Sequence, residues 1–486
     1  MMTPRTMLLA CALLAGPAGA VAAHQPQAHQ SPTPARPPAA APPAVPAPPP
    51  AVELQAAAPA RRVTLSEALE LGREYNPAMV QAQQNVRVAG MGVMQAWGAY
   101  LPSITGTGNA TRNSSQRVNQ FGVAQSTSLT DNSSFGISAS LSLFTGFQRG
   151  ANLRAAHATR DLNQAALLQQ DYATDLATKQ AFFNALATQE LVGVAQANLA
   201  QNDQQLRLTT EKLRLGATTR SDSLTASVSY GTAEVQLIQA RANALTAQAN
   251  LARAIGGQGM VAAVPDTALE IRLTSLDSAT LRREAEATAP SVVEAQAGVT
   301  ASEASLSASR SQYYPTVSLS AGQTWAGGQL PWNAAPVTQI TDSTGAVIGL
   351  VRSAKYTGTW NLRLSLSVPI FNGFQREASI VSADANAVSA RAKLRDARLA
   401  LDANLTQAVT ALDAAAAQID VSRTSVAAAQ ESLRMQQERY RLGASTIVDL
   451  LTAETALNQA QVTLVQARYN YLIARATLEA LVGHTL

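Results

Sequence analysis

Phe144-Thr145-Gly146-Phe147-Gln148-Arg149 returns further along the chain as Phe371-Asn372-Gly373-Phe374-Gln375-Arg376, 227 positions later. The same spacing holds downstream, where Arg214-Leu215-Gly216-Ala217 returns as Arg441-Leu442-Gly443-Ala444. A fixed spacing between unrelated motifs indicates an internal duplication, which has to be recognised before a fold is assigned. The chain therefore contains two copies of one structural unit, aligned without a gap over this part.

The upstream parts of the two copies align at a different spacing. Asn76-Pro77 matches Ala289-Pro290, and Leu101-Pro102 matches Tyr314-Pro315, each at 213 positions. The second copy has therefore gained 14 residues between its Pro315 and its Phe371. Because insertions are tolerated mainly in exposed connections, we expect this one in a loop.

Segments of alternating polarity flank the variable region. In the second copy the alternating apolar residues are Trp360, Leu362, Leu364, Leu366 and Val368, and the first copy repeats the pattern from Phe135 to Leu143. A period of two places all these side chains on one face of a strand, and roughly nine to eleven residues let a tilted strand cross a bilayer. A third strand starts near Val317, and the fourth has glycine, Gly106 and Gly108, at two apolar positions. We expect strand hairpins at about 103–143 and about 316–370.

Long helices are predicted between these hairpins. From about Gly146 to Leu215 there is no proline, and alanine, leucine, glutamine and threonine dominate. At 1.5 Å per residue, a helix of this length reaches roughly 100 Å. A second helix is expected from near Ser221 toward Gly256, and the repeat copies the pair into about 374–441 and 448–483. A long soluble coiled coil with a β-tip is the alternative, but it would expose every apolar strand face to water.

The composition limits the functions that the chain can have. Its formal net charge is +4, with basic and acidic residues spread along the chain, so nucleic acid is not an expected partner. Four histidines are scattered, and HExxH, Walker A and Gly-x-Ser-x-Gly motifs are missing from the sequence. We therefore expect no enzymatic activity, no cofactor and no metal site.

The first 60 residues are predicted to lie outside the fold. Residues 1–23 have the pattern of a signal peptide, with Arg5, an apolar run from Met7 to Leu14 and small residues after it. The only cysteine, Cys11, lies in this run, and a lipid anchor at Cys11 is the alternative interpretation. Residues 24–60 hold twelve of the 22 prolines and are predicted to be a disordered tether. No later stretch is apolar for long enough to form a spanning helix, so entry into a membrane would require strands.

Two hairpins supply four strands per chain, which cannot close on themselves in a membrane. An open sheet edge in a bilayer leaves backbone groups unpaired, and membrane barrels start at about eight strands. Several chains must therefore share one barrel. Two, three or four copies would all satisfy this requirement.

The duplicated motifs, in their order, resemble the TolC outer-membrane efflux family. The resemblance rests on Leu65-Ser66-Glu67-Ala68 leading to Asn76-Pro77, on the two Phe-x-Gly-Phe-Gln-Arg segments, and on the two Leu-Gly-Ala turns followed by Asp222 and Asp449. It implies a mixed α/β membrane protein, whose four-stranded β segment completes a trimeric 12-stranded outer-membrane β-barrel that continues as a long periplasmic α-helical barrel. Repeat 1 then covers residues 61–256, an equatorial linker 257–280 and repeat 2 residues 281–486, with residues 112–133 and 326–357 as extracellular loops.

The resemblance also implies a function and partners. The expected function is the outer-membrane channel of a tripartite export system, in drug efflux or type I secretion, with a non-conducting helical envelope scaffold as the alternative. The implied partners are two further copies of the chain, a periplasmic adaptor (membrane fusion) protein, an inner-membrane pump of the RND, ABC or MFS type, and outer-membrane lipid.

Candidate site residues follow from the same resemblance. Tyr440, Asp222 and Asp449 match the family's pore gate, whereas Ser445 and Thr452 depart from it, and Arg220 is a candidate partner for Asp222. Each aspartate could instead cap the helix that follows its turn. The residues implied to meet the adaptor at the periplasmic tip are Leu215, Gly216, Ala217, Leu442, Gly443 and Ala444. Aromatic residues expected at the membrane interface, or packed at the strand-to-helix junctions, are Phe144, Phe147, Phe371 and Phe374.

Overall fold

The computed structural model describes residues 61–118, 124–265, 278–328, 337–341, 343, 345, 347–352 and 356–485, all within one compact unit, Ala58–Leu486. The predicted signal peptide (1–23) and the proline-rich tether (24–60) lie outside the described residues. Within the described ranges, no helix combines the length and the apolar content that crossing a membrane requires.

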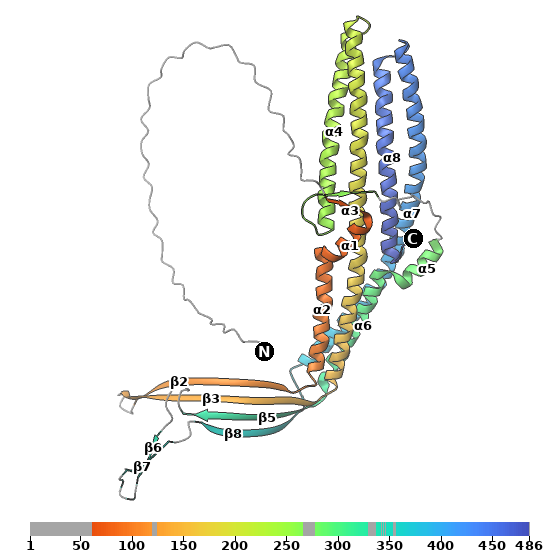
Figure 1. Ribbon diagram of the computed structural model, residues 1–486. Coiled ribbons are helices and arrows are strands. Elements are labelled where there is room, and N and C mark those ends of the chain that lie inside the picture. The colour runs from red at the N-terminus through yellow and green to blue at the C-terminus, as the bar shows by residue number, and fades with distance from the viewer. Residues whose placement is uncertain are drawn as a thin grey trace, which may run out of the picture. The chain divides into compact units, whose positions relative to one another are not determined.

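The helices follow the duplication. The helices of repeat 1 are α1 (Leu65–Tyr75), α2 (Pro77–Gly98), α3 (Gln148–Arg214) and α4 (Arg220–Ala254). Those of repeat 2 are α5 (Ser278–Thr288), α6 (Pro290–Arg310), the short η1 (Ser311–Tyr313), α7 (Gln375–Arg441) and α8 (Ile447–Val482). The helices α3 and α7 both contain 67 residues, roughly 100 Å each. Figure 1 shows α3 with α4 and α7 with α8 as two hairpins, and α8 packs against α3.

The start of each long helix is fixed by the motif that revealed the repeat. Phe147 and Phe374 precede α3 and α7 with φ angles of 66° and 64°, and each follows a glycine with φ of 61° (Gly146) or 67° (Gly373). Two successive left-handed residues turn the chain sharply from strand to helix, which glycine tolerates and phenylalanine rarely adopts. The same local geometry at both sites explains why both helices begin at a Gln 227 positions apart.

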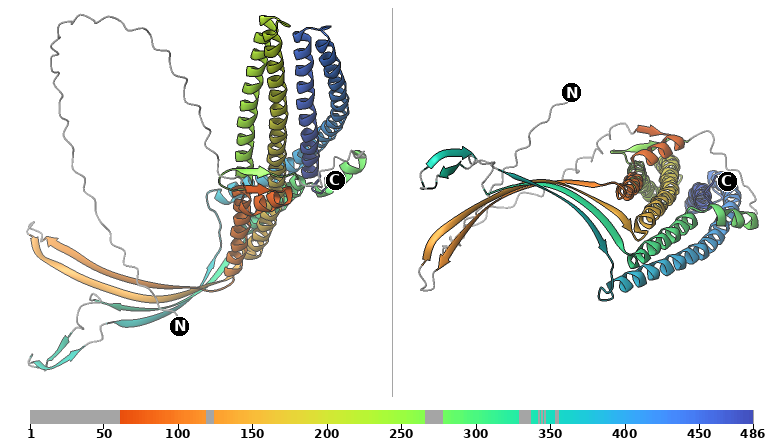
Figure 2. Two further views of the ribbon diagram at one scale, coloured as in Figure 1. Left: turned by 45° about the horizontal axis from the view of Figure 1, so that its top comes forward. Right: turned by 90° about the horizontal axis from the view of Figure 1, so that it is seen from below.

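The principal sheet has four antiparallel strands in the order β2 (Ser103–Val118), β3 (Ala124–Thr145), β5 (Thr316–Gly327) and β8 (Thr357–Ser367). Figure 2 shows them side by side as one curved sheet. Ser103 lies opposite Ser140 in the first hairpin, and Thr316 lies opposite Ser367 in the second. These four positions are equivalent at the repeat spacings of 213 and 227, so both hairpins have the same register.

The strands differ from the sequence prediction in three places. Residues 112–133, expected as a loop, are mostly strand, and Arg112 lies opposite Asp131 with a bidentate ion pair at 2.7 and 2.9 Å. The expected loop 326–357 contains a hairpin of β6 (Val337–Thr341) and β7 (Val347–Arg352). A bulge at Leu143 breaks the predicted alternation, so that Phe144 lies opposite Val317.

A small parallel ladder joins the start of repeat 1 to the linker. β1 (Arg61–Val63) pairs with β4 (Val261–Ala263), within the predicted linker 257–280. Val63 and Val261 are buried there in an apolar cluster with Phe182 and Leu251 of the α3–α4 hairpin. A second cluster, around Leu405 and Leu478, holds α5, α7 and α8 together. Each hairpin of long helices is thus anchored by its own core.

Candidate functional site

One face of the four-stranded sheet is predominantly apolar. The register places Ile104 opposite Ala139, Ala139 opposite Ala321, and Ala321 opposite Leu362. The large side chains of β8 on this face are exposed, with Trp360 77% and Leu364 67% accessible. An apolar face this open to solvent fits contact with hydrocarbon.

The other face of the sheet is polar. Ser140 lies opposite Ser320, which lies opposite Arg363, and Gly322 lies opposite Asn361. A Cβ atom on residue 322 would lie 2.9 Å from Asn361 Oδ1, so the glycine leaves room for this amide. A sheet with one apolar and one polar face is the arrangement of a strand set between lipid and water.

Aromatic rings gather where strands meet helices. Phe144 packs on Phe147 and Phe371 on Phe374, both edge-to-face with centroids 5.4 Å apart. Phe147 also contacts Tyr314, at 5.6 Å. The expected packing at the junctions is therefore present in the structure, and a role of these rings at a membrane interface stays a prediction.

Sequence reasoning missed a tyrosine–arginine contact at each junction. The Arg149 guanidinium lies 4.9 Å from the Tyr100 ring centroid, and that of Arg376 lies 4.1 Å from Tyr313. Arg149 also donates to the Leu143 carbonyl at 2.8 Å. The signal was available, because Tyr100 and Tyr313 are 213 positions apart, at equivalent positions of the two repeats.

The opposite ends of the long helices form two exposed turns. Leu215 and Leu442 are each 75% accessible. The glycines that follow, Gly216 and Gly443, have φ of 70° and 73°, which ends each helix in the left-handed conformation. The six residues predicted to meet an adaptor therefore lie at the tips of the α3–α4 and α7–α8 hairpins; their binding role stays a prediction.

The helices after both turns begin with the same reciprocal cap. Thr219 is the N-cap of α4 and accepts from the Asp222 N–H at 3.2 Å, while the Asp222 carboxylate accepts from the Thr219 N–H at 3.2 Å. Thr446 and Asp449 repeat this at α8, with distances of 3.2 and 3.0 Å. The aspartates thus stabilise the helix starts as third residues, and the threonines are the caps.

Hydrogen bonding keeps both aspartates ionised. The Thr218 hydroxyl, followed by the Thr219 side chain and N–H, lowers the pKa of Asp222 below its usual range. The Thr446 N–H and hydroxyl lower the pKa of Asp449. Among the described contacts, Arg220 makes none with Asp222, and Thr218 and Thr219 fill the place predicted for it. A role of either carboxylate in a pore stays a prediction.

Tyr440 connects the two hairpins at the tip. This half-buried ring at the end of α7 lies 4.2 Å from the Lys212 ammonium of α3. Burial, and then the negative charge of Asp222, raise the pKa of the Tyr440 phenol, while contacts with Thr218 and Gln205 oppose the shift. The hydroxyl is therefore neutral, and Thr218 and Gln205 of the opposite hairpin are its hydrogen-bonding neighbours.

The two departures from the family's gate make no hydrogen bond between helices among the described contacts. Thr452 donates to the carbonyl of Val448 in its own helix at 2.8 Å. The Ser445 hydroxyl is buried without a hydrogen-bond partner in the described part of the chain. The described contact between the two hairpins at the tip is that of Lys212 with Tyr440, which are 228 positions apart in the sequence.

Ion pairs join α3 to α8 further along the helices. Lys179 Nζ lies 2.6 Å from Glu479 Oε2, with both side chains largely buried. Arg468 Nη1 lies 3.5 Å from Glu190 Oε1. Burial next to Glu190 raises the pKa of Tyr469 to about 12. Polar contacts therefore run from the tip towards the middle of the helices.

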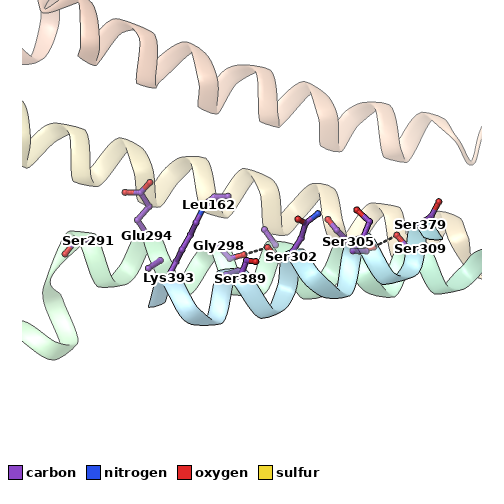
Figure 3. A pocket seen from close by; sticks show the side chains of 16 residues that line it. Leu162, Ser291, Glu294, Gly298, Ser302, Ser305, Ser309, Ser379, Ser389 and Lys393 are labelled. Carbon is purple, nitrogen blue, oxygen red and sulfur yellow. Dashed lines mark hydrogen bonds between the residues drawn. The ribbon is translucent and has the colours of Figure 1, made fainter. Parts of the chain in front are cut away.

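A groove of about 830 Å³ lies between α6 and α7, beside Leu162 of α3 (Figure 3). Serine and alanine dominate its lining, but Ser302 and Ser309 donate to carbonyls of their own helix, Gly298 at 2.8 Å and Ser305 at 3.1 Å. Binding pockets need polar groups that converge on a ligand. In the described part of the chain there is also no cluster of His, Cys, Asp and Glu suited to a metal ion.

The profile of the family described as "Outer membrane efflux protein" matches residues 68–257 and 281–484, one segment in each repeat. The chain belongs to this family. The efflux protein BepC of Brucella suis is 26% identical over 418 residues, covering 85% of this chain and 84% of BepC. TolC of Escherichia coli is 25% identical over 319 residues, covering 63% of this chain and 61% of TolC.

Solved structures share the fold. The CmeC outer membrane channel of Campylobacter jejuni superposes with a TM-score of 0.69 at 16% identity, over 86% of this chain and 85% of CmeC. VceC of Vibrio cholerae superposes with a TM-score of 0.66 at 18% identity, over 87% of this chain and 96% of VceC. The predictions of a TolC-type duplicated fold and of an outer-membrane location with a periplasmic extension are confirmed. The chain is an outer-membrane efflux channel protein, and the family is one of channels.

Proposed function

We propose that this efflux channel is the outer-membrane duct of a tripartite export system, assembled from three copies of the chain. One observation supports this above all: a sheet with an apolar and a polar face is continuous in sequence with helices of roughly 100 Å. Such a unit supplies a lipid-facing wall and a long tube from the same residues. A non-conducting scaffold has no use for the polar face that carries Asn361 and Arg363.

The oligomer follows from the strand order. Strands β2 and β8 are the edges of the described sheet, and edges in a bilayer must be paired. The strand pairing between the two repeats within the chain supplies a template, since β3 of repeat 1 pairs with β5 of repeat 2. The residues of β3 correspond to those of β8 at a spacing of 227, and the residues of β5 to those of β2 at a spacing of 213. The equivalent contact between copies therefore pairs β8 of one protomer with β2 of the next.

The template also sets the register between protomers. Ser138 lies opposite Gly322, and the spacings turn this pair into Ser365 opposite Asn109 of the partner subunit. In the same register Leu366 and Val368 lie opposite Gly108 and Gly106 of the partner subunit. The two glycines that interrupt the apolar pattern of β2 would thus accommodate two large side chains.

An exposed apolar ridge on α4 is also explained when a contact within the chain is transferred, by the repeat spacings, to a contact between protomers. It consists of Leu224, Val228, Val235 and Ile238. Within the chain, Val194 of α3 and Val462 of α8 line one hollow at the α3–α8 contact. Their equivalents are Val421, 66% accessible, and Val235, 65% accessible. Val421 of one protomer would therefore cover Val235 of the partner subunit.

The exposed turns are the proposed docking points for the rest of the system. Leu215 and Leu442 extend from both hairpin tips, where apolar side chains suit the hairpins of a periplasmic adaptor protein. The adaptor in turn would connect the duct to an inner-membrane pump of the RND, ABC or MFS type. The cargo, a drug or a secreted polypeptide, is selected by that pump.

Conductance of the purified protein in a planar bilayer tests the duct directly. The expected result is a current that rises in equal steps, each step corresponding to the insertion of one trimeric pore. Folded trimers that insert but carry no current would support the scaffold instead.

A further inference from the structure

Glu454 is a carboxyl group buried between the two hairpins. It lies in the second turn of α8 with only 6% of its surface accessible. Its Oε2 atom has no hydrogen-bond partner in the described part of the chain. Ionising a buried carboxyl with one oxygen unpaired is costly, which favours the protonated form.

The surroundings of Glu454 are polar but uncharged. It opens onto a hollow of about 120 Å³ between α3, α4 and α8, large enough for water. The hollow is lined by Asn198, Asn202, Ser229, Thr232, Ala233, Gln236, Leu451, Glu454, Thr455 and Asn458. On α3, Gln201 contacts Glu454, and Gln205, one turn closer to the tip, contacts Tyr440.

Charged groups on the neighbouring helices do not reach Glu454. On α7, Tyr440 of the adjoining apolar cluster stays neutral, and Glu431 pairs with Arg434 at 2.6 Å on the exposed side. On α3, Asp203 pairs with Arg207 at 2.8 Å, and on α4, Glu234 is exposed. Burial is the cause that raises the pKa of Glu454, opposed only by contact with Gln201.

The carboxyl is specific to one of the two repeats. The equivalent position in α4 is Ser227, which is exposed. The equivalents of Gln201 and Gln205 in α7 are Ala428 and Ser432. The contact within the chain therefore carries an acid and two amides that the proposed contact between copies lacks.

We infer that Glu454 is a proton-operated clasp between α8 and the α3–α4 hairpin. While it is protonated, the carboxyl packs neutrally against Gln201 and holds the hairpins together near the tip. When it ionises, the charge draws water into the hollow and loosens this contact. The consequence for conduction rests on the proposed function, because only in a duct does the spacing of the hairpins control a passage.

The direction of the pH effect follows from the packing. Burial raises the pKa above the ordinary 4.5, so the packed state binds the proton more tightly than the parted state. The packed contact is fully favoured below 4.5 and loses this contribution as the pH rises through the raised pKa. Within that window, the ratio of packed to parted forms falls by up to about tenfold per pH unit in each copy.

Hydrogen exchange of the residues around 450–458 tests the clasp without relying on conduction. In the purified wild type, protection of this segment should fall as the pH rises from about 5 to about 8, after correction for the intrinsic exchange rate. Glu454→Gln, which imitates the protonated form, should remain protected throughout. The exposed carboxyl removed in Glu234→Gln should leave the wild-type profile unchanged.

A pH profile shared by the wild type and Glu454→Gln, or a wild type without pH dependence, would overturn the clasp. Bilayer conductance of the same samples separates this result from the proposed function. Pores that conduct while the exchange profile lacks the predicted pH dependence refute the clasp alone. Protein that never conducts but shows the predicted exchange refutes the duct alone.

Discussion

The Lys212 ammonium of α3 lies 4.2 Å from the centroid of the Tyr440 ring of α7. The two residues belong to different repeats and to different hairpins. Their contact joins the ends of the helices beside the exposed turns, where the gate of the family is expected. A cation over a tyrosine ring contributes about 0.5–1 kcal/mol at exposed sites and more when partly buried.

Removing this cation should loosen the tip. Lys212→Met keeps the length of the side chain but loses the attraction to the ring, so we expect open events in planar bilayers to increase by about two- to fivefold. Lys393→Met, which removes a lysine from the groove between α6 and α7, is the matched control and should behave like the wild type. Equal effects of the two substitutions would show that Lys212 has no specific role in the gate.

Gly146 and Gly373 are equivalent residues with different surroundings. A Cβ on Gly146 would lie 2.4 Å from Tyr314 Cβ, whereas Gly373 has no described atom within 4 Å of such a position. Left-handed backbone alone costs alanine about 1–2 kcal/mol. Gly373→Ala should therefore fold with a modest loss of stability, and Gly146→Ala should lose much more.

Thermal unfolding of both variants checks this difference. Since the repeat operation places Gly373 against Leu101 of the partner subunit, Gly373→Ala should also slow assembly. Identical melting temperatures for the two variants would contradict the contact between Gly146 and Tyr314.

Asp449 permits a test of charge at the tip. Asp449→Asn keeps an oxygen that can accept from the Thr446 N–H, so the start of α8 should persist while the charge is lost. We expect lower cation preference in a salt gradient, with assembly unchanged. A reversal potential equal to that of the wild type would assign Asp449 to the cap alone.

The cap and the clasp should respond to different pH ranges. The hydrogen bonds from Thr446 lower the pKa of Asp449, so the charge is present above the ordinary 3.8 and is lost only as the pH falls through the lowered pKa. Cation preference should therefore stay constant over the pH range in which Glu454 loses its proton.

The proposed contact between Val421 and Val235 of the partner subunit can be tested by charge. Val421→Asp or Val235→Lys alone would bury an unpaired charge and should abolish the trimer, measured by size and mass in detergent. The double variant pairs the two charges and should recover trimers at least in part. A trimer that tolerates each single charge would show that α7 and α4 do not meet there.

The sequence was sufficient where structure is local. The glycines of both turns and the Phe-x-Gly-Phe-Gln motifs set the helix ends, so α3, α4, α7 and α8 lie within a few residues of their predicted bounds. The alternation of β8 gave the apolar face because every second side chain of a strand must share a face.

What the sequence missed depends on distant contacts. The bulge at Leu143 shifts the alternation through pairing with β5, and β2 and β3 continue to pair beyond residue 112, where Arg112 lies opposite Asp131. The partner of Tyr440 and the burial of Glu454 arise only when α3 packs against the second hairpin. Neither has a pattern of spacing that the sequence could display.

The central claim is that three chains close one sheet by pairing β8 with β2. Its most direct test is oxidation of the double variant Ser365→Cys and Asn109→Cys in outer membranes, in a chain whose only natural cysteine, Cys11, lies in the predicted signal peptide. We predict a ladder of covalent dimers and trimers that ends at three copies. The Ser140→Cys, Ser320→Cys pair should close within one chain and give no ladder. No bridge between copies, or a ladder that ends at two or four, would contradict the trimeric duct.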